Sequence, residues 1–216
     1  MCVTLSFGTD AWHVSRGLLQ SVITMPYYAR KLEDPAVKDI KIRGAWNAPV
    51  FELFLLWLHT GSYPEQSGFT KKVWTGKNLV YDGELKAMRA SSADTMVWTI
   101  KAAWLAWRFG SFLGAKQFQN YAMTRLFKAY ERQNPKATVD VDICQDSTGP
   151  VRMFFEDIAI RNWGDRSVVD DTPEEWARAI GKDDRFRLEF MKGVAMPLEK
   201  RREEPMKLEK YLLKED

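Results

Sequence analysis

The chain has 216 residues, of which 45% are hydrophobic and nine are tryptophan, so its composition excludes an intrinsically disordered protein. Its 32 basic residues are interspersed with 29 acidic ones, which argues against a nucleic-acid-binding face, because such a face gathers basic residues together. Two cysteines are too few for a disulfide-stapled secreted fold, no signal-peptide pattern opens the sequence, and no apolar run reaches ~18 residues, so we expect an intracellular, cytoplasmic or nuclear protein without a membrane partner.

The first part of the chain predicts a hairpin, two short helices and a further strand. Residues 3–7 alternate apolar and polar side chains, which is the period of a half-buried strand, and a turn at residues 8–10 follows them. Residues 16–23 and 26–32 predict the two helices, and residues 40–43 predict the strand.

The segment PVFELFLLWLHTGSY, residues 49–63, predicts a helix in the core of the protein. Within residues 50–58 only Glu52 is polar, so no side of this helix suits water. Pro49 suits a first helical turn, and Gly61 suits the left-handed position that ends a helix.

Residues 64–95, with glycines spaced through them, predict a long insertion or hairpin carried on the core. Two helices follow it, at residues 96–109 and 115–132, and Gly110 is predicted to end the first of them. Apolar residues lie on more than one side of the first helix, so we expect both of its sides to be covered.

The last third of the chain predicts further helices. Residues 138–143 alternate apolar and polar side chains, and a helix then runs through residues 150–163 to Gly164. Thr172 and Glu175 have the spacing of a capping box, in which each side chain binds the backbone N–H group of the other residue.

The C-terminal segments carry two predicted apolar faces. Phe186 and Phe190 share one side of a helix, four residues apart. Residues 198–216 form a charge-rich tail, whose predicted docking face is Leu208, Tyr211 and Leu212.

Several of these segments resemble parts of one protein family. Trp57-Leu58-His59-Thr60-Gly61 resembles the WLYTG signature that closes the central helix of BTB/POZ domains, with histidine in place of the usual tyrosine. Residues 3–7, 12–19 and 26–28 resemble, in the same order, the first strand, the F-x-V-H-K-x-L-L segment and the S-P-Y-F segment of that family. Residues 146–160 resemble a segment that follows the core in many fungal BTB proteins.

The resemblance implies an α+β fold in two parts. Residues 1–133 would form a BTB/POZ-like core, a small sheet with a cluster of helices, with the insertion at residues 64–95, and residues 134–216 would form a mostly helical extension.

The resemblance also implies a protein–protein interaction module that self-associates or binds other proteins, and many such domains are adaptors of cullin-type ubiquitin ligases. The residues that would correspond to the scaffold contact are Val50, Glu52, His59 and Tyr63. The strand-swapped BTB dimer uses an arm before the first strand, and here that strand begins almost at the first residue. We therefore predict that self-association uses another surface.

The sequence predicts no catalytic, metal or cofactor site. It contains only two histidines, and no Gly-x-Ser-x-Gly, His-Glu-x-x-His or Gly-x-Gly-x-x-Gly motif. Cys2, Cys144, His13 and His59 lack the short spacings of structural zinc sites, and His59 is better explained as a cation at its helix C-terminus. Glu156 and Asp157 are interpreted as solvated acids, and Asp170 and Asp171 as acids placed just ahead of a helix N-cap.

The tryptophans leave an alternative open, a small-molecule or nucleic-acid binder that uses exposed Trp and Arg side chains. Trp57, Trp104 and Trp107 lie on helices patterned for burial and are predicted to belong to the core. The residues in or near loops, which are the candidates to anchor a partner, are Trp46, Trp74 and Trp163.

Overall fold

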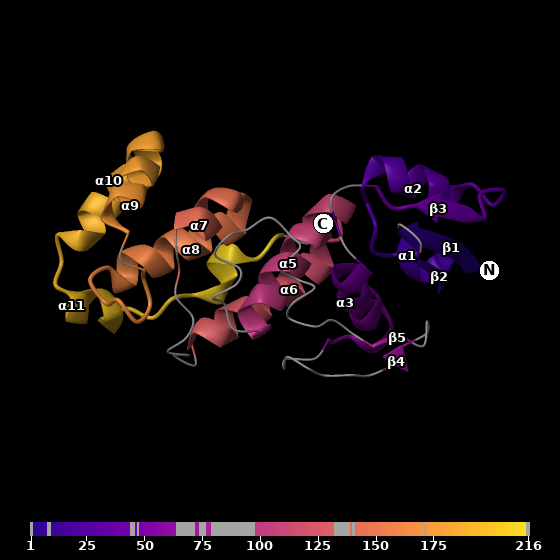
Figure 1. Ribbon diagram of the computed structural model, residues 1–216, viewed down its shortest axis with the longest axis horizontal. Coiled ribbons are helices and arrows are strands. Elements are labelled where there is room, and N and C mark those ends of the chain that lie inside the picture. The colour runs from indigo at the N-terminus through magenta and orange to yellow at the C-terminus, as the bar shows by residue number, and fades with distance from the viewer. Residues whose placement is uncertain are drawn as a thin grey trace.

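The computed structural model has a mixed α+β fold that is mostly helical, with a small sheet at one end and the last helices at the other (Figure 1). The α+β class predicted from the sequence is therefore confirmed. The structure describes residues 2–7, 10–43, 46, 48–63, 72–73, 77–78, 98–131, 139, 141–170 and 172–214.

The sheet contains β1 (Cys2–Phe7), β2 (Asp10–Ser15) and β3 (Asp39–Lys41), in the order β2-β1-β3. The hairpin partner β2 is antiparallel to β1, whereas β3 is parallel to it. Because side chains alternate between the two faces of a strand, one face is buried throughout. This face consists of Val3, Leu5, Trp12, Val14 and Ile40.

Two short helices, α1 (Arg16–Gln20) and α2 (Pro26–Glu33), connect β2 to β3. The buried guanidinium of Arg16 donates to the carbonyl oxygens of Leu32 (2.7 Å) and Asp34 (2.8 Å) at the end of α2. The last carbonyl groups of a helix have no partner inside the helix, so this arginine closes the end of α2.

Helix α3 (Ala48–Thr60) is the predicted core helix, and every residue from Val50 to Leu56 is buried. The ring of Phe51 contacts the indole of Trp12 on the sheet, with centroids 4.7 Å apart. Gly61 follows the helix with φ 74°, and its N–H donates to the carbonyl oxygen of Trp57 (2.7 Å). The predicted end of the core helix at Gly61 is therefore confirmed.

Only two short strands of the predicted insertion at residues 64–95 are described. They are β4 (Lys72–Val73) and β5 (Lys77–Asn78), which pair antiparallel. The rest of the insertion, including Trp74, lies outside the described residues.

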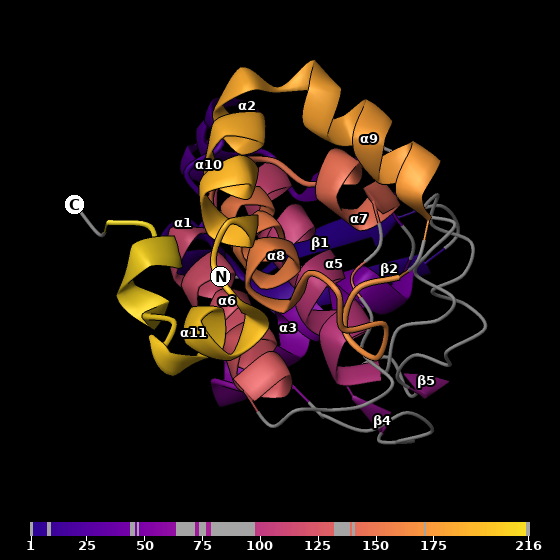
Figure 2. The ribbon, with the colours of Figure 1, turned by 90° about the vertical axis from the view of Figure 1, so that its left-hand side faces the viewer.

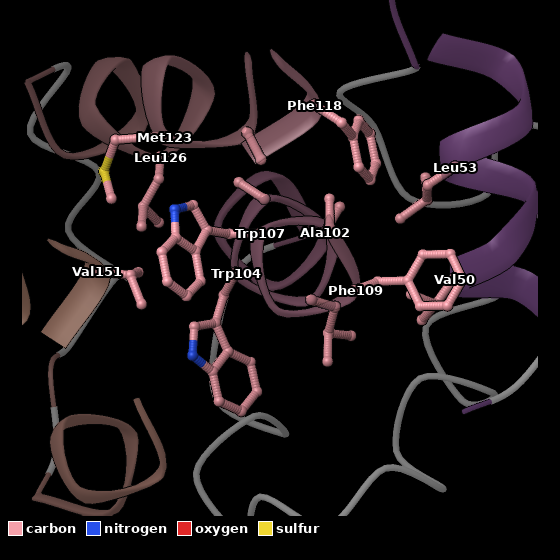
Figure 3. Packing of buried hydrophobic residues seen from close by; sticks show 14 of the residues in the cluster. Val50, Leu53, Ala102, Trp104, Trp107, Phe109, Phe118, Met123, Leu126 and Val151 are labelled. Atoms are coloured by element: carbon pink, nitrogen blue, oxygen red, sulfur yellow. The ribbon is translucent and has the colours of Figure 1, made fainter. Parts of the chain in front are cut away.

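Helix α5 (Trp98–Leu113) crosses the middle of the molecule and packs along α6 (Lys116–Glu131). Figure 3 shows the indole ring of Trp107 directed toward Leu126 and Val151, while Phe109 points toward α3; Trp104 leaves the same helix in another direction and donates to Ser147. Both sides of α5 are therefore covered, as its apolar pattern predicts.

The prediction that Gly110 ends this helix is wrong. Helix α5 continues to Leu113, and Gly114 (φ 68°) makes the turn into α6. A Cβ atom at Gly110 would lie 2.7 Å from Cγ of Gln119, so glycine is required here for the close crossing of α6.

Helices α7 (Val141–Asp146) and α8 (Gly149–Asn162) begin the C-terminal third. Among the described residues of the alternating pattern at 138–143, Val139 forms a β-bridge with Val169, and residues 141–143 lie in α7 and not in a strand. Helix α8 ends just before Gly164 (φ 96°), the residue predicted to close it.

Helices α9 (Pro173–Lys182) and α10 (Asp184–Val194) form the far end of the molecule. The predicted capping box of α9 is absent, since Thr172 makes no side-chain cap and its Oγ1 donates instead to Asp170 (3.3 Å). At the start of α10, a carboxylate oxygen of Asp183 accepts the N–H of Phe186 (3.0 Å). The rings of Phe186 and Phe190 lie 6.0 Å apart on one side of α10, as predicted.

The chain finishes with α11 (Leu198–Glu203), an extended stretch and the 3-10 helix η2 (Leu208–Tyr211). Figure 2 shows α11 in front of the ends of α6 and α8. The η2 turn contacts both of these helices. Tyr211 is buried and Leu208 and Leu212 pack against the core, so the predicted docking face is confirmed.

Candidate functional site

The four residues predicted to contact a partner lie on α3 and just after it, but only one of them is open to solvent. The side chains of Val50, Glu52 and Tyr63 are 0%, 5% and 6% exposed, whereas His59 is exposed. The structure therefore does not bring the four together as one surface. Contact with a partner stays a prediction, and the exposed part of it is His59 with its neighbour Thr60.

A threonine closes the end of α3. The hydroxyl of Thr60 donates to the carbonyl oxygen of Leu56 (2.7 Å). Desolvation lowers the pKa of His59 below its ordinary value of 6.5. This direction does not favour the cation that the sequence predicts for His59 at this helix end, and its role there stays a prediction.

Tyr63 anchors the segment after α3. Its backbone N–H donates to the hydroxyl of Tyr121 on α6 (3.3 Å), and the two rings lie 5.1 Å apart. Burial raises the pKa of the Tyr63 hydroxyl well above its ordinary value. This side chain belongs to the packing between α3 and α6.

The tryptophans of the described residues are packed against other side chains. Trp104 and Trp107 are buried as predicted, Trp57 is half-buried, and the Nε1 atom of Trp104 donates to the hydroxyl of Ser147 (3.0 Å). Trp46 packs against Phe109 and Phe112. Trp163 packs between Trp176 and Phe190, with ring centroids 5.5 Å and 4.7 Å away. These rings are not stacking platforms for a base.

The interpretation of Glu156 and Asp157 as solvated acids is wrong, whereas Asp170 lies just ahead of the α9 N-cap, as predicted. Glu156 is 2% exposed and accepts hydrogen bonds from Arg152 (2.8 Å) and Arg185, an ion-pair network that joins α8 to α10. Asp170 accepts the indole N–H of Trp176 (2.9 Å). Asp157 contacts the C-terminal segment, as described next, and Asp171 lies outside the described residues.

Residues 207–213, which we name the tail segment, contact both α6 and α8. The side chains of these helices that bind it, which we name the tail-binding surface, are Asn120, Phe127, Phe154 and Asp157. The ring of Tyr211 packs against side chains of both helices, with centroids 5.3 Å from Phe154 and 6.3 Å from Phe127, and these two rings lie 6.0 Å from each other. Its hydroxyl donates to Asp157 Oδ2 (2.6 Å), and Lys210 Nζ donates to the same oxygen (2.6 Å). Burial is the largest cause that raises the pKa of the Tyr211 hydroxyl, and its hydrogen bond to Asp157 raises this pKa further.

The side-chain amide of Asn120 on α6 binds the backbone of the tail segment at two points. Its Nδ2 donates to the carbonyl oxygen of Leu213 (2.9 Å), and its Oδ1 accepts the N–H of the same residue (2.7 Å). Sequence reasoning missed Asn120. Its partner is 93 residues away along the chain, and no local pattern marks such a pair.

Three arginines join α11 and the following residue to the end of α8. Arg201 donates to the carbonyl oxygens of Ile160 (2.6 Å) and Trp163 (2.7 Å), which lie in the last turn of α8 and just after it. Arg202 donates to Asn162 (3.0 Å) and Asp165 (2.5 Å), and Arg161 donates to the carbonyl oxygens of residues 202 and 204. Guanidinium groups at a helix C-terminus satisfy its free carbonyls and its dipole.

A cavity of about 430 Å³ lies beside these arginines, and its apolar wall includes Phe127, Tyr130 and Phe154. Its charged lining is balanced, with Arg161 and Arg202 opposed by Glu131 and Asp165. The hydrogen bond from Arg202, followed by those from Ser167, lowers the pKa of Asp165 to about 2. The volume suits a small ligand, but the balanced charges select neither an anion nor a cation.

Apolar side chains are also exposed on the outer side of α10 and just after it. Leu188, Met191 and Met196 are 54%, 63% and 48% exposed. They lie at the far end of the molecule from the sheet (Figure 1).

Comparisons with known proteins give no relative. Within the described residues, no group of three or more His, Cys, Asp or Glu side chains is placed to hold a metal ion. In the same part of the chain, no helix combines the length and the apolar character needed to cross a membrane.

No family model matches the chain, and neither the curated proteins nor the solved structures contain a match.

Proposed function

We propose that this chain is a protein–protein interaction module of the BTB/POZ type. The observation that carries the proposal is the order of elements around α3. The hairpin β1–β2, the helices α1 and α2, the parallel strand β3 and the enclosed helix α3 follow each other as the segments of the resemblance do.

The alternative of a nucleic-acid or small-molecule binder has less support. Trp46 and Trp163 are packed against other rings, and Arg161, Arg201 and Arg202 donate to backbone or side-chain oxygens of the chain itself. These groups therefore already have partners within the protein.

The narrower proposal is that the module is an adaptor on a cullin-type scaffold. Its support is the resemblance of the α3 end, where His59 and Thr60 are exposed. Because Val50, Glu52 and Tyr63 are buried, a scaffold contact at this end of α3 would use His59, Thr60 and the loop after them.

The test is capture of partners by the full chain, followed by mass spectrometry. The variant His59→Glu places a charge at the exposed end of α3, and the matched control is His13→Glu, because His13 is an exposed histidine on β2. We expect a defined set of proteins that is lost with His59→Glu and retained with His13→Glu. Binding of a purified cullin N-terminal region, measured by calorimetry, tests the adaptor role.

Equal capture by the heat-unfolded chain and the native chain would contradict an interaction module. Capture that is unaffected by His59→Glu would contradict the use of the α3 end.

A further inference from the structure

The tail segment is held on the tail-binding surface through contacts that a separate peptide can also make. The Asn120 amide binds backbone groups, the neighbouring rings of Phe127 and Phe154 both pack against an aromatic ring, and Asp157 accepts from the hydroxyl and the ammonium group. These are the elements of linear-peptide recognition, in which main-chain hydrogen bonds give affinity and side-chain pockets give specificity.

The connection between the tail segment and the rest of the chain, which we name the linker, is extended at both of its ends. Helix α11 stops at Glu203, and the backbone is extended at Glu204 (ψ 118°) and at Lys207 (φ −111°, ψ 118°). Pro205 and Met206 line both the 430 Å³ cavity and a second cavity of about 330 Å³ on the side of Tyr211. The linker therefore runs between two cavities, while α11 before it is bound to α8 by Arg201 and Arg202.

We propose that the tail-binding surface is a peptide-recognition site, and that its occupant in trans is the tail segment of a second copy of this chain. The surface and its ligand belong to the same sequence, so every copy carries a partner that fits every other copy. Exchange of an identical element through a linker requires no new interface. This inference rests on the proposed interaction role and names a partner and a surface for it, away from the N-terminal strand.

Docking in cis competes with exchange. A tethered segment has an effective concentration in the millimolar range for short flexible linkers, so the wild-type chain is expected to be monomeric at micromolar concentration. Exchange between copies can be detected in a mixture of two variants that cannot dock in cis. One variant keeps an intact tail-binding surface, and the other keeps an intact tail segment.

The experiment uses two complementary variants of the full chain. Asn120→Ala with Asp157→Ala disables the tail-binding surface and keeps the tail, and Tyr211→Ala disables the tail and keeps the tail-binding surface. Each alone is expected to be a monomer by light scattering, while the equimolar mixture at about 0.2 mM forms a one-to-one dimer. Replacing Tyr211→Ala by Glu209→Ala, a change at an exposed tail residue, leaves docking in cis intact, and this mixture stays monomeric.

A second tail variant, Leu213→Pro, removes the N–H that Asn120 accepts and leaves Tyr211 in place, so it serves where Tyr211→Ala fails to fold. The direct measurement is fluorescence polarisation with a labelled peptide, PMKLEKYLLK, of residues 205–214. We expect binding to the tail-disabled chain and at least ~10-fold weaker binding to the wild type, because docking in cis blocks the tail-binding surface. The chain whose tail-binding surface is disabled binds no peptide.

Monomeric mixtures with both tail variants, together with no peptide binding, overturn the inference. That result leaves the proposed function standing, because its own test depends on His59 and on proteins other than this one. Dimerisation of the mixture without any captured partner supports tail exchange and contradicts the binding of other proteins that the proposed function expects.

Discussion

The sheet-and-α3 region and the C-terminal helices are held together by different forces. Around α3, rings from separate elements meet directly, as Trp12 with Phe51 and Phe54 with Phe118 do. Around α8, guanidinium groups bind carbonyl oxygens and carboxylates, and cavities lie beside them. Apolar burial therefore fixes the first region, whereas specific polar contacts position the elements of the second, and the two regions respond differently to substitution.

The largest expected effect comes from the core of the first region. Phe54→Ala removes a fully buried ring that contacts Phe109 and Phe118, and we expect a loss of about 3–5 kcal/mol in the free energy of unfolding, measured with urea. Phe190→Ala, at a half-buried ring on α10, is the matched control and should cost less. Equal losses would remove the contrast between the regions.

The next effect tests packing at the far end of the molecule. A Cβ atom at Gly193 on α10 would overlap Cγ2 of Ile160 on α8, so Gly193→Ala should cost about 1–3 kcal/mol. The double variant Gly193→Ala with Ile160→Ala removes the overlapping atom. A double-mutant cycle should therefore show a coupling that favours the pair, and additive losses would contradict the close packing of these helices.

Loss of one arginine contact should have a smaller effect. Arg201→Gln weakens the contacts to the carbonyl oxygens of Ile160 and Trp163, with an expected cost of about 1–3 kcal/mol in chemical denaturation. Lys200→Gln removes a neighbouring exposed charge and should stay within about 0.5 kcal/mol of wild type. A similar loss in both variants would show that net charge, and not the helix-end contact, matters.

The smallest effect depends on pH. The pKa of Asp165 is about 2 in the folded chain and 3.8 ordinarily, so its carboxylate favours folding above pH 3.8 and loses this contribution as the pH falls through about 2. Asp165→Asn should reduce the acid dependence of stability in this window, measured by thermal unfolding at each pH. Because the pair with Arg202 is partly exposed, added salt should weaken the difference, and unchanged acid dependence would contradict the contact.

Local patterns predicted much of the first region. The core helix, its end at Gly61 and the hairpin follow from apolar runs, periodicity and the conformational preference of glycine. The rule failed at Gly110, because the reason for that glycine is a neighbouring helix and not the end of its own.

The candidate sites were less predictable. Burial of Val50 follows from the apolar run of α3, whereas burial of Glu52 and Tyr63 depends on the elements that cover them, which local sequence does not report. The apolar pattern of the tail predicts Tyr211 as part of its docking face. Its partner Asp157 lies 54 residues earlier, and such a pair leaves no trace in local sequence.

The position of α5 has a practical consequence. Trp104 and Trp107 of this helix pack toward residues of the C-terminal third, including Val151 and, through a hydrogen bond, Ser147 (Figure 3). A fragment ending at residue 133 would expose both indoles to water and should aggregate. Cleavage between α6 and α7 by limited proteolysis would therefore give two fragments that stay associated. Neither fragment would be recovered alone in soluble form.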